Sequence, residues 1–324
     1  MTHENAVQGA WAALRQGRFI KPIAGAAMGD PTKIERWALI HSAAGASALD
    51  VRWEPRCVAA ARRGRDQARQ RLGEQSGWPV IMASITPEGD VHTLKAKLEP
   101  DRCAPCPACQ TVCPDDALKL PADGPVEYFY DRCRGCDRCV EACPTGALSM
   151  IKIKEGEFRP RLRASLSAGA ESVEVHASDL PDHELDQVLR DLDAEVDNDV
   201  LVSICLGSLQ KPMREVYGST EVIRERRRGR PTMIQADGKT MGSRPGGLVA
   251  LGLAELIIDA RLPNTWVVAS GGVTPLAWRI AELTGLETGA VGLGIESYRV
   301  IADFVNDDRL TSDDALLLEA ADAA

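Results

Sequence analysis

A repeated cysteine motif is the feature that most constrains this chain. Residues 101–118 (DRCAPCPACQTVCPDDAL) and 131–148 (DRCRGCDRCVEACPTGAL) align without gaps at an offset of 30 residues, with 9 of 18 positions identical. Each copy has the spacing C-x2-C-x2-C-x3-C-P, and of the ten cysteines only Cys57 and Cys205 lie outside the two copies. A disulfide scaffold would distribute its cysteines through a short chain, so this dense block indicates thiolates that bind metal.

The spacing predicts two cubane iron–sulfur clusters. Two residues between successive thiolates allow a tight loop to surround one cluster, and the fourth cysteine of such a run binds the neighbouring cluster. The predicted ligands are Cys103, Cys106, Cys109 and Cys143 for cluster I, and Cys133, Cys136, Cys139 and Cys113 for cluster II. The alternative is a pair of zinc sites, but zinc usually takes two separated cysteine pairs. Between the copies, residues 119–130 should form a loop and a short strand, with Tyr128, Phe129 and Tyr130 shielding the clusters from water.

The flanking sequence alternates short apolar runs with longer amphipathic ones, which is typical of βα units. Eight strands are predicted, at 19–26, 48–52, 79–85, 172–177, 199–206, 231–236, 265–270 and 289–293. Helical patterns lie between them, for example at 31–44, 55–72, 183–193, 246–261 and 275–284. Eight such units favour an α/β fold of the (β/α)8, TIM-barrel type, although an open doubly wound sheet has similar local patterns.

The cysteine block interrupts this series after the third strand. The predicted organisation is a first part of the barrel (10–98), a ferredoxin-like 2[4Fe-4S] insertion (99–152), a second part of the barrel (153–306) and an acidic, alanine-rich tail (307–324) that forms a terminal helix with a frayed end. Loops that follow barrel strands lie at the carboxyl-terminal face, where barrel enzymes keep their sites. The clusters should therefore lie over the barrel mouth.

Weaker signals occur at the same face. Glycines after the seventh and eighth strands could let backbone N–H groups approach an anion or a cofactor, or could simply permit tight turns. The candidate residues are Ser270, Gly271, Gly272, Gly292 and Gly294. Gln235, Asp237 and Lys239 after the sixth strand are read as a turn rather than a ligand contact.

Three further kinds of residue were given structural interpretations. Lys21 should reach the rim or pair with a carboxylate such as Asp50 or Glu174. His176 reads as a satisfied structural histidine, and Cys57 and Cys205 as small buried hydrophobes.

Composition limits the classes of protein and of partner. With 38 Lys and Arg against 47 Asp and Glu, the net charge is −9, which argues against nucleic acid as a partner. The single basic run, 224–230, reads as a solvated helix end. Apolar residues make up 44% of the chain, enough for a large core, but no run reaches the roughly 18 residues that a membrane span needs. The polar start also lacks a signal-peptide core, so a cytoplasmic protein is expected.

The sequence resembles the cyanobacterial light-dependent-period iron–sulfur (LdpA) family over roughly residues 11–304. The cysteine block and six other segments carry the resemblance: LRQGRFIKPIAGA (14–26), AGASALDVRWEP (44–55), SVEVHA (172–177), IQADGKTMG (234–242), ASGGV (269–273) and GLGIESYR (292–299). The resemblance implies cluster binding at the eight cysteines, a cytoplasmic location, and association with clock-input proteins.

These observations favour a redox-sensing or electron-transfer protein that exchanges electrons with a redox partner protein or a soluble donor and supplies light or redox input to the circadian clock. The alternative is a barrel oxidoreductase in which the clusters pass electrons to a flavin or a phosphate-bearing substrate at the barrel mouth. No acid–base pair stands out in the sequence to support the enzyme, so a non-enzymatic sensor is the leading hypothesis.

Overall fold

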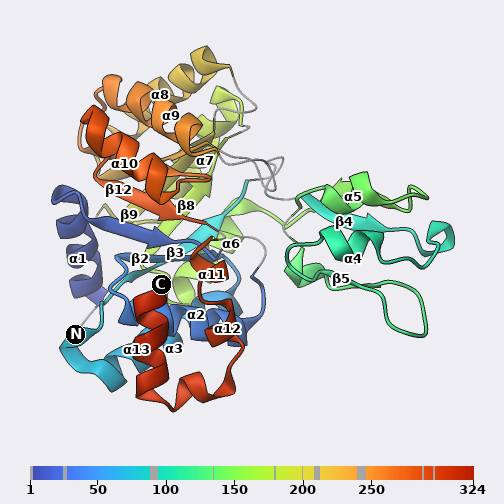
Figure 1. Ribbon diagram of the computed structural model, residues 1–324. Coiled ribbons are helices and arrows are strands. Elements are labelled where there is room, and N and C mark those ends of the chain that lie inside the picture. The colour runs from blue at the N-terminus through green and yellow to red at the C-terminus, as the bar shows by residue number, and fades with distance from the viewer. Residues whose placement is uncertain are drawn as a thin grey trace.

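Eight parallel strands form the central sheet (Figure 1) of the computed structural model, which describes residues 3–24, 28–87, 94–133, 135–178, 180–198, 200–207, 212–238, 246–286, 288–294 and 296–324. The strands are β1 (Phe19–Pro22), β2 (Ala48–Arg52), β3 (Val80–Ile85), β8 (Ser172–His176), β9 (Leu201–Gly207), β10 (Thr232–Asp237), β11 (Thr265–Ser270) and β12 (Ala290–Leu293). Their order in the sheet is β1-β12-β11-β10-β9-β8-β3-β2.

Backbone hydrogen bonds between the first and last strands of this order close the sheet. The N–H of Ser47 donates to the carbonyl of Ile20, and the N–H of Ala24 donates to the carbonyl of Asp50, both at 2.9 Å. A parallel bridge also joins Ile23 to Asp50. The predicted (β/α)8 barrel is therefore confirmed, and the open doubly wound sheet is excluded.

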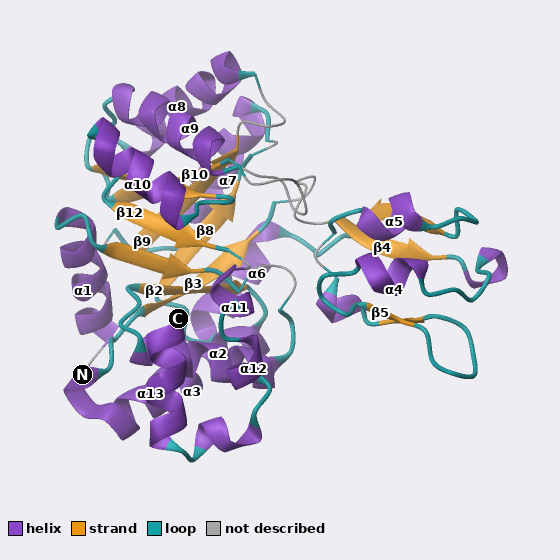
Figure 2. Cartoon of the chain, in the orientation of Figure 1, coloured by secondary structure: helices purple, strands orange, loops and turns teal. Residues whose placement is uncertain are grey.

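Helices cover the outside of the barrel (Figure 2), as the amphipathic runs predicted. They are α2 (Pro31–Ala43), α3 (Pro55–Leu72), α6 (Phe158–Ser167), α7 (Asp182–Asp193), α8 (Met213–Arg227), α9 (Gly247–Asp259) and α10 (Pro275–Thr284), followed by the short α11 (Glu296–Arg299) and α12 (Ala302–Val305). A 3-10 turn, η1 (Gly73–Gln75), ends α3. Every residue of β2 is buried, because this strand faces the barrel interior on one side and the helices on the other.

The amino-terminal helix α1 (His3–Arg15) closes the end of the barrel at which the strands begin. Its apolar side chains belong to one buried cluster with residues from the first turns of the strands, including Phe19, Leu201 and Met233. Trp11 packs against Trp266 with ring centroids 5.1 Å apart. The opposite, carboxyl-terminal end of the barrel is left for a site.

The carboxyl-terminal segment packs against the barrel helices. It comprises η5 (Asp308–Thr311) and α13 (Asp314–Ala323). Leu317 and Ala320 are fully buried in a cluster with residues of α2 and α3, and Arg71 of α3 pairs with Asp314 at 2.7 Å. The expected terminal helix is present, and only residues 322–324 at its end are exposed.

The basic run at the end of α8 is not the solvated helix end that the sequence suggested. Arg227 is only 4% exposed and pairs with Asp193 on the neighbouring α7. Arg224 donates to the carbonyl of Ala260 at the end of α9. The arginines therefore fasten α8 to the helices on both sides, a role that depends on tertiary neighbours rather than on the local charge pattern.

The insertion leaves the barrel after β3 and returns at α6. It contains β4 (Leu94–Leu98), η3 (Pro100–Arg102), α4 (Ala108–Val112), β5 (Leu118–Lys119), β6 (Glu127–Tyr128), η4 (Tyr130–Arg132), α5 (Arg138–Ala142) and β7 (Leu148–Lys152). The antiparallel pair β4–β7 sets Leu94 opposite Lys152, so the insertion enters and leaves at one place. It projects from the barrel on the side opposite α1 (Figure 1). No helix in the described ranges is long and apolar enough to cross a membrane.

A buried histidine in the helical layer should make the fold sensitive to acid. His41 is 2% exposed and donates from Nε2 to the carbonyl of Ser297 at 2.8 Å; burial lowers its pKa from 6.5 to about 4. Between these values the unfolded chain binds a proton that the folded chain does not, so stability falls as the pH falls through this window, by about 3 kcal/mol in all. Denaturation with urea at several pH values should show that His41→Gln removes this part of the slope. An unchanged slope would contradict the assignment.

Candidate metal centre

The two cysteine motifs have the same local structure at an offset of 30 residues. The N–H of Glu99 donates to Ala147, and the N–H of Phe129 donates to Ala117, both at 2.8 Å. Each motif begins in a 3-10 turn and continues into a five-residue helix, α4 or α5. The repeat seen in the sequence is thus a repeat of structure.

Each of two cavities in the insertion is lined by four cysteines. The first, of about 290 Å³, is lined by Cys103, Cys106, Cys109 and Cys143. The second, of about 330 Å³, is lined by Cys113, Cys133, Cys136 and Cys139. In each cavity three cysteines come from one motif and the fourth from the other, which is the grouping that the spacing predicted. All ten cysteines are free thiols.

Backbone amides point at the sulfurs of these cavities. The N–H of Ala117 lies 3.2 Å from Cys113 Sγ, and the N–H of Ala147 lies 3.3 Å from Cys143 Sγ. Burial opposes ionisation of Cys143, but hydrogen bonds from Thr145 and from backbone amides outweigh it and lower the pKa of that thiol. Such donors stabilise the thiolate form, which is the form that binds metal.

Cys139 shows why the second cavity needs a cation. Burial, together with the neighbouring Cys133, Cys136 and Cys113, raises the pKa of the Cys139 thiol to about 12. Four thiolates cannot stay together in an apolar cavity without positive charge to compensate them. Iron ions supply that charge, so the donor set and the electrostatics both fit an iron–sulfur cluster.

The aromatic residues between the motifs have different roles. Tyr128 lines the second cavity, and burial followed by a hydrogen bond with Cys133 raises the pKa of its hydroxyl. Phe129 instead packs under the Arg132 guanidinium, 4.5 Å from the ring centroid, and Tyr130 is 41% exposed. The predicted shielding role therefore fits Tyr128 but not Tyr130.

The second cavity is joined to the barrel by a buried lysine. Lys95 is 1% exposed, donates to the carbonyl of Cys133, and lies 5.2 Å from the centroid of the Tyr130 ring. Burial, followed by the nearby Arg52 at the end of β2, lowers the pKa of Lys95 to about 8. Arg52 in turn pairs with Glu54 at 2.6 Å. This contact brings the cavity that contains Cys133 next to the carboxyl end of a barrel strand.

A buried ion pair occupies the barrel interior. Lys21 pairs with Asp50 at 2.9 Å and with Glu174, and all three side chains are fully buried, so the expected pairing of Lys21 is confirmed. Although burial opposes it, the pairing with Asp50 and Glu174 raises the pKa of Lys21, so the amine is a cation rather than a nucleophile. Burial raises the pKa of Asp50 to about 6, whereas the contacts with Lys21 lower that of Glu174 despite its burial.

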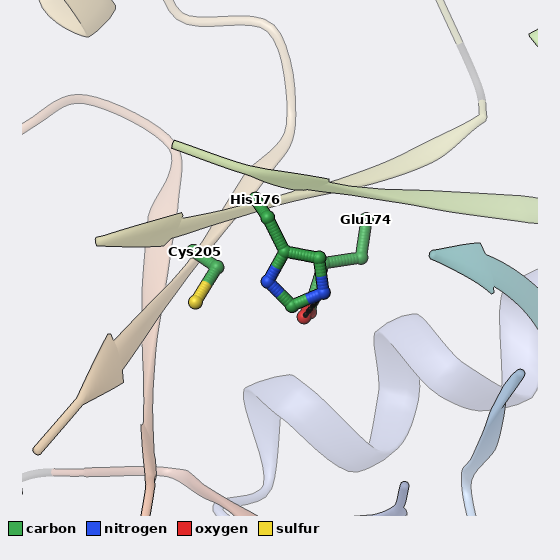
Figure 3. Close-up of side chains that lie close together, drawn as sticks. All are labelled: Glu174, His176 and Cys205. Carbon is green, nitrogen blue, oxygen red and sulfur yellow. Dashed lines mark ion pairs between the residues drawn. The ribbon is translucent and has the colours of Figure 1, made fainter. Parts of the chain in front are cut away.

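Glu174, His176 and Cys205 meet at the carboxyl end of β8 and β9 (Figure 3), with one ligand atom of each within 4.8 Å of the others. His176 and Cys205 are register partners on neighbouring strands, and His176 Nε2 lies 3.0 Å from Ser84 Oγ. The sequence analysis treated His176 as structural and Cys205 as a small hydrophobe. Cys205 is fully buried, yet its neighbours are polar. The signal that could have joined these residues is their common position at strand ends.

The glycine-rich loops at the barrel mouth pack closely on one another. A Cβ added at Gly292 would lie 2.7 Å from Ser270 Oγ, and Gly271 and Gly272 have φ of 74° and 90°. Both observations fit the interpretation of these glycines as tight turns and close packing. Gly294 has open space around its Cα, and nothing else in the structure tests an anion site. Lys239 lies outside the described residues.

Comparison with known proteins supports the metal centre. Residues 95–144 match the family model of a 4Fe-4S dicluster domain. The chain is also 33% identical over 108 residues to Light dependent period A of Synechococcus elongatus. It is an iron–sulfur protein similar to Light dependent period A. The alignment covers 33% of this chain and 30% of that relative, so less than a third of the relative's length is matched.

Solved barrel structures cover more of the chain, with low identity. A putative deoxyribose-phosphate aldolase from Coccidioides immitis gives a TM-score of 0.49 at 12% identity, covering 95% of this chain and 98% of that one. The YdjI aldolase from Escherichia coli K12 gives 0.47 at 8% identity, covering 98% of this chain and 91% of that one. The barrel assignment rests on the strand order and closure described above, and the 4Fe-4S dicluster domain lies after the third strand of that barrel.

Proposed function

We propose that this protein is an electron-transfer and redox-sensing protein that binds two [4Fe-4S] clusters. Cys103, Cys106, Cys109 and Cys143 hold cluster I, and Cys133, Cys136, Cys139 and Cys113 hold cluster II. The observation that carries the proposal is the pair of four-cysteine cavities, each completed by a cysteine from the other motif. Because the two motifs exchange ligands, neither half can bind its cluster without the other.

Each bound cluster would accept one electron, and the surrounding residues would set how readily it does so. Amide donors such as Ala117 and Ala147 stabilise the more negative, reduced state. Leu98, Val126 and Leu148 line the first cavity and exclude water from one side of it. Exposed Arg102, Asp137 and Arg138 provide charges for docking a redox partner protein or a soluble electron donor. Arg134, another predicted docking residue, lies outside the described residues.

The similarity to Light dependent period A supports a more specific role. We infer that the redox state of the clusters supplies a light- or redox-dependent input to the circadian clock, through contacts with clock-input proteins in the cytoplasm. A change in cluster charge on reduction would alter the electrostatic contacts that the insertion makes with such a partner. Pull-down with reduced and oxidised protein should give different amounts of partner; equal capture in both states would contradict the sensing role.

Anaerobic analysis of iron, sulfide and flavin tests the central proposal. We expect about eight iron and about eight sulfide per chain, a brown protein, and two one-electron transitions in a redox titration. Colourless protein that contains zinc in place of iron would overturn the proposal, because the cysteines would then be zinc ligands.

Lys95 provides a separate test of how cluster II is tuned. Its ammonium group lies beside Cys133, and the first motif has no equivalent, because the position 30 residues later is Pro125. Lys95→Met should lower the potential of one cluster by tens of millivolts, on the order expected for losing one nearby positive charge, and leave the other unchanged. Potentiometric EPR measures both. Arg102→Met is the matched control, because Arg102 is an exposed cation in the first motif. Equal shifts of both clusters would contradict the assignment.

A barrel oxidoreductase is the second candidate function. It is favoured by one observation: Lys95 and Arg52 join the cluster II cavity to the carboxyl end of a barrel strand, where enzymes of this fold bind their substrates. Cluster II would then pass electrons to a flavin or a phosphate-bearing substrate near Ser270, Gly271, Gly272, Gly292 and Gly294. Flavin released by heat from anaerobically purified protein would support this function. Retention of that flavin in Gly294→Leu would contradict the assigned position of the site.

A further inference from the structure

A second group of metal-binding side chains lies at the barrel mouth, apart from the eight cysteines of the insertion. Glu174 and His176 are on β8, Cys205 is on β9, and Asp237 ends β10. One ligand atom each from Glu174, His176 and Cys205 lies within 4.8 Å of the other two. Figure 3 shows the imidazole of His176 between the carboxylate of Glu174 and the sulfur of Cys205.

The carboxylate of Glu174 has one oxygen engaged and one aimed at this group. Oε2 accepts from Lys21 and, at 2.9 Å, from Ser203 Oγ. Oε1 is fully buried and has no hydrogen-bond partner among the described residues; His176 Nε2 lies 3.9 Å from it. A buried charged oxygen without a partner is costly, so this atom indicates a ligand that is not part of the chain.

The sulfur of Cys205 lies in a polar environment suited to a thiolate. Gln235 Nε2 points at Cys205 Sγ from 3.5 Å, and Asp237 Oδ2 lies 3.8 Å away. An amide that donates to the sulfur is a common outer contact of a metal-bound thiolate. A carboxylate this close would oppose ionisation of the thiol unless a cation lay between them.

The charges in the barrel interior also leave room for a cation. Lys21 supplies one positive charge to two fully buried carboxylates, Asp50 and Glu174. Asp237 adds a further acidic group at the same end of the barrel. A divalent ion beside Glu174 Oε1 would offset this excess of negative charge where water cannot.

We propose that Glu174, His176 and Cys205 bind a divalent transition-metal ion of the zinc class at the barrel mouth. One carboxylate oxygen, one imidazole nitrogen and one thiolate form a mixed donor set that zinc accepts in four-coordinate sites. Three protein ligands leave the fourth position for water or for an oxygen of a small ligand, as in catalytic zinc sites. The site is separate from the clusters, and the proposal does not depend on their function.

Metal analysis of the intact, cluster-loaded chain tests this proposal. Protein prepared anaerobically, equilibrated with zinc sulfate and desalted should retain about one zinc per chain in addition to the cluster iron. His176→Gln and Cys205→Ser, which nearly preserve side-chain volume, should each weaken zinc binding by roughly tenfold or more while cluster iron stays constant. Cys57→Ser is the matched control, because Cys57 is the other buried cysteine outside the insertion; its zinc content should equal that of the wild-type chain.

Zinc-edge X-ray absorption shows which residues hold the metal. The barrel site should give one sulfur at about 2.3 Å and nitrogen or oxygen ligands at about 2.0–2.2 Å, whereas zinc in a cluster cavity would give an all-sulfur shell. An all-sulfur shell, absence of retained zinc, or equal zinc in wild-type, His176→Gln and Cys205→Ser proteins would each overturn the proposal. Loss of iron with retention of the mixed shell would instead count against the proposed clusters and leave the barrel site standing.

Discussion

Replacing Cys113 with serine is expected to remove cluster II, although Cys113 belongs to the first motif. Its sulfur lines the same cavity as Cys133, Cys136 and Cys139, so the variant should lose about half of the bound iron and one of the two redox transitions. Cys143→Ser should remove cluster I for the same reason. Iron analysis and EPR of anaerobically purified variants measure the loss. Cys57→Ser, outside the insertion, should retain full iron content.

Pairs of substitutions separate the exchanged arrangement from a sequential one. Cys106→Ser combined with Cys143→Ser should cost no more iron than either change alone, because both residues line one cavity. Cys106→Ser combined with Cys113→Ser should remove both clusters, even though the two cysteines are in one motif. If instead the second pair removed only one cluster, each motif would bind its own cluster and the proposed ligand sets would be wrong.

The second large effect is expected from Lys21→Met in the barrel. This change leaves Asp50 and Glu174 buried without their cation, and removing one partner of a buried ion pair costs about 3–5 kcal/mol. Urea denaturation at neutral pH should show a loss of this size. The exposed pair Arg279–Glu282 offers a matched control, since Arg279→Ala should cost less than about 1 kcal/mol.

Stability of the Lys21→Met variant should also depend on pH in a defined direction. In the wild-type chain burial already raises the pKa of Asp50 to about 6, and loss of Lys21 removes the contact that opposes this rise. A carboxyl whose folded pKa is raised contributes stability that is present below its unfolded pKa of 3.8 and is lost as the pH rises through the folded value. The variant should therefore regain part of its stability between neutral pH and pH 4. A loss that stayed constant over this range would show that packing, rather than buried charge, causes the effect.

Much of the fold was predictable because barrel strands carry their signal locally. Fully buried parallel strands appear as short apolar runs, and seven of the eight predicted strands match the observed bounds to within about two residues. The exception is β1, which was expected to reach residue 26 but ends at Pro22. Beyond that point Ile23 keeps only a single bridge, to Asp50, because the chain leaves the barrel there.

The grouping of the eight cysteines was also predictable, since it follows from spacing along the chain. Two residues between thiolates set a loop radius, and a cysteine before proline points away from its own loop. Tertiary structure was needed for the environment of these residues. That Lys95 joins Cys133 to the barrel, and that Tyr130 is half exposed while Tyr128 lines a cavity, depends on how the insertion packs against β2.

By itself the amino-acid sequence determined the alternation of strands and helices, the place of the insertion and the two sets of cysteines, because each is encoded by residues close together in the chain. Only the tertiary structure decided that the barrel closes, that Lys21 meets Glu174 across 153 positions, and that Glu174, His176 and Cys205 share one buried space. These contacts arise from strand register and barrel curvature, and neither leaves a local pattern in the sequence.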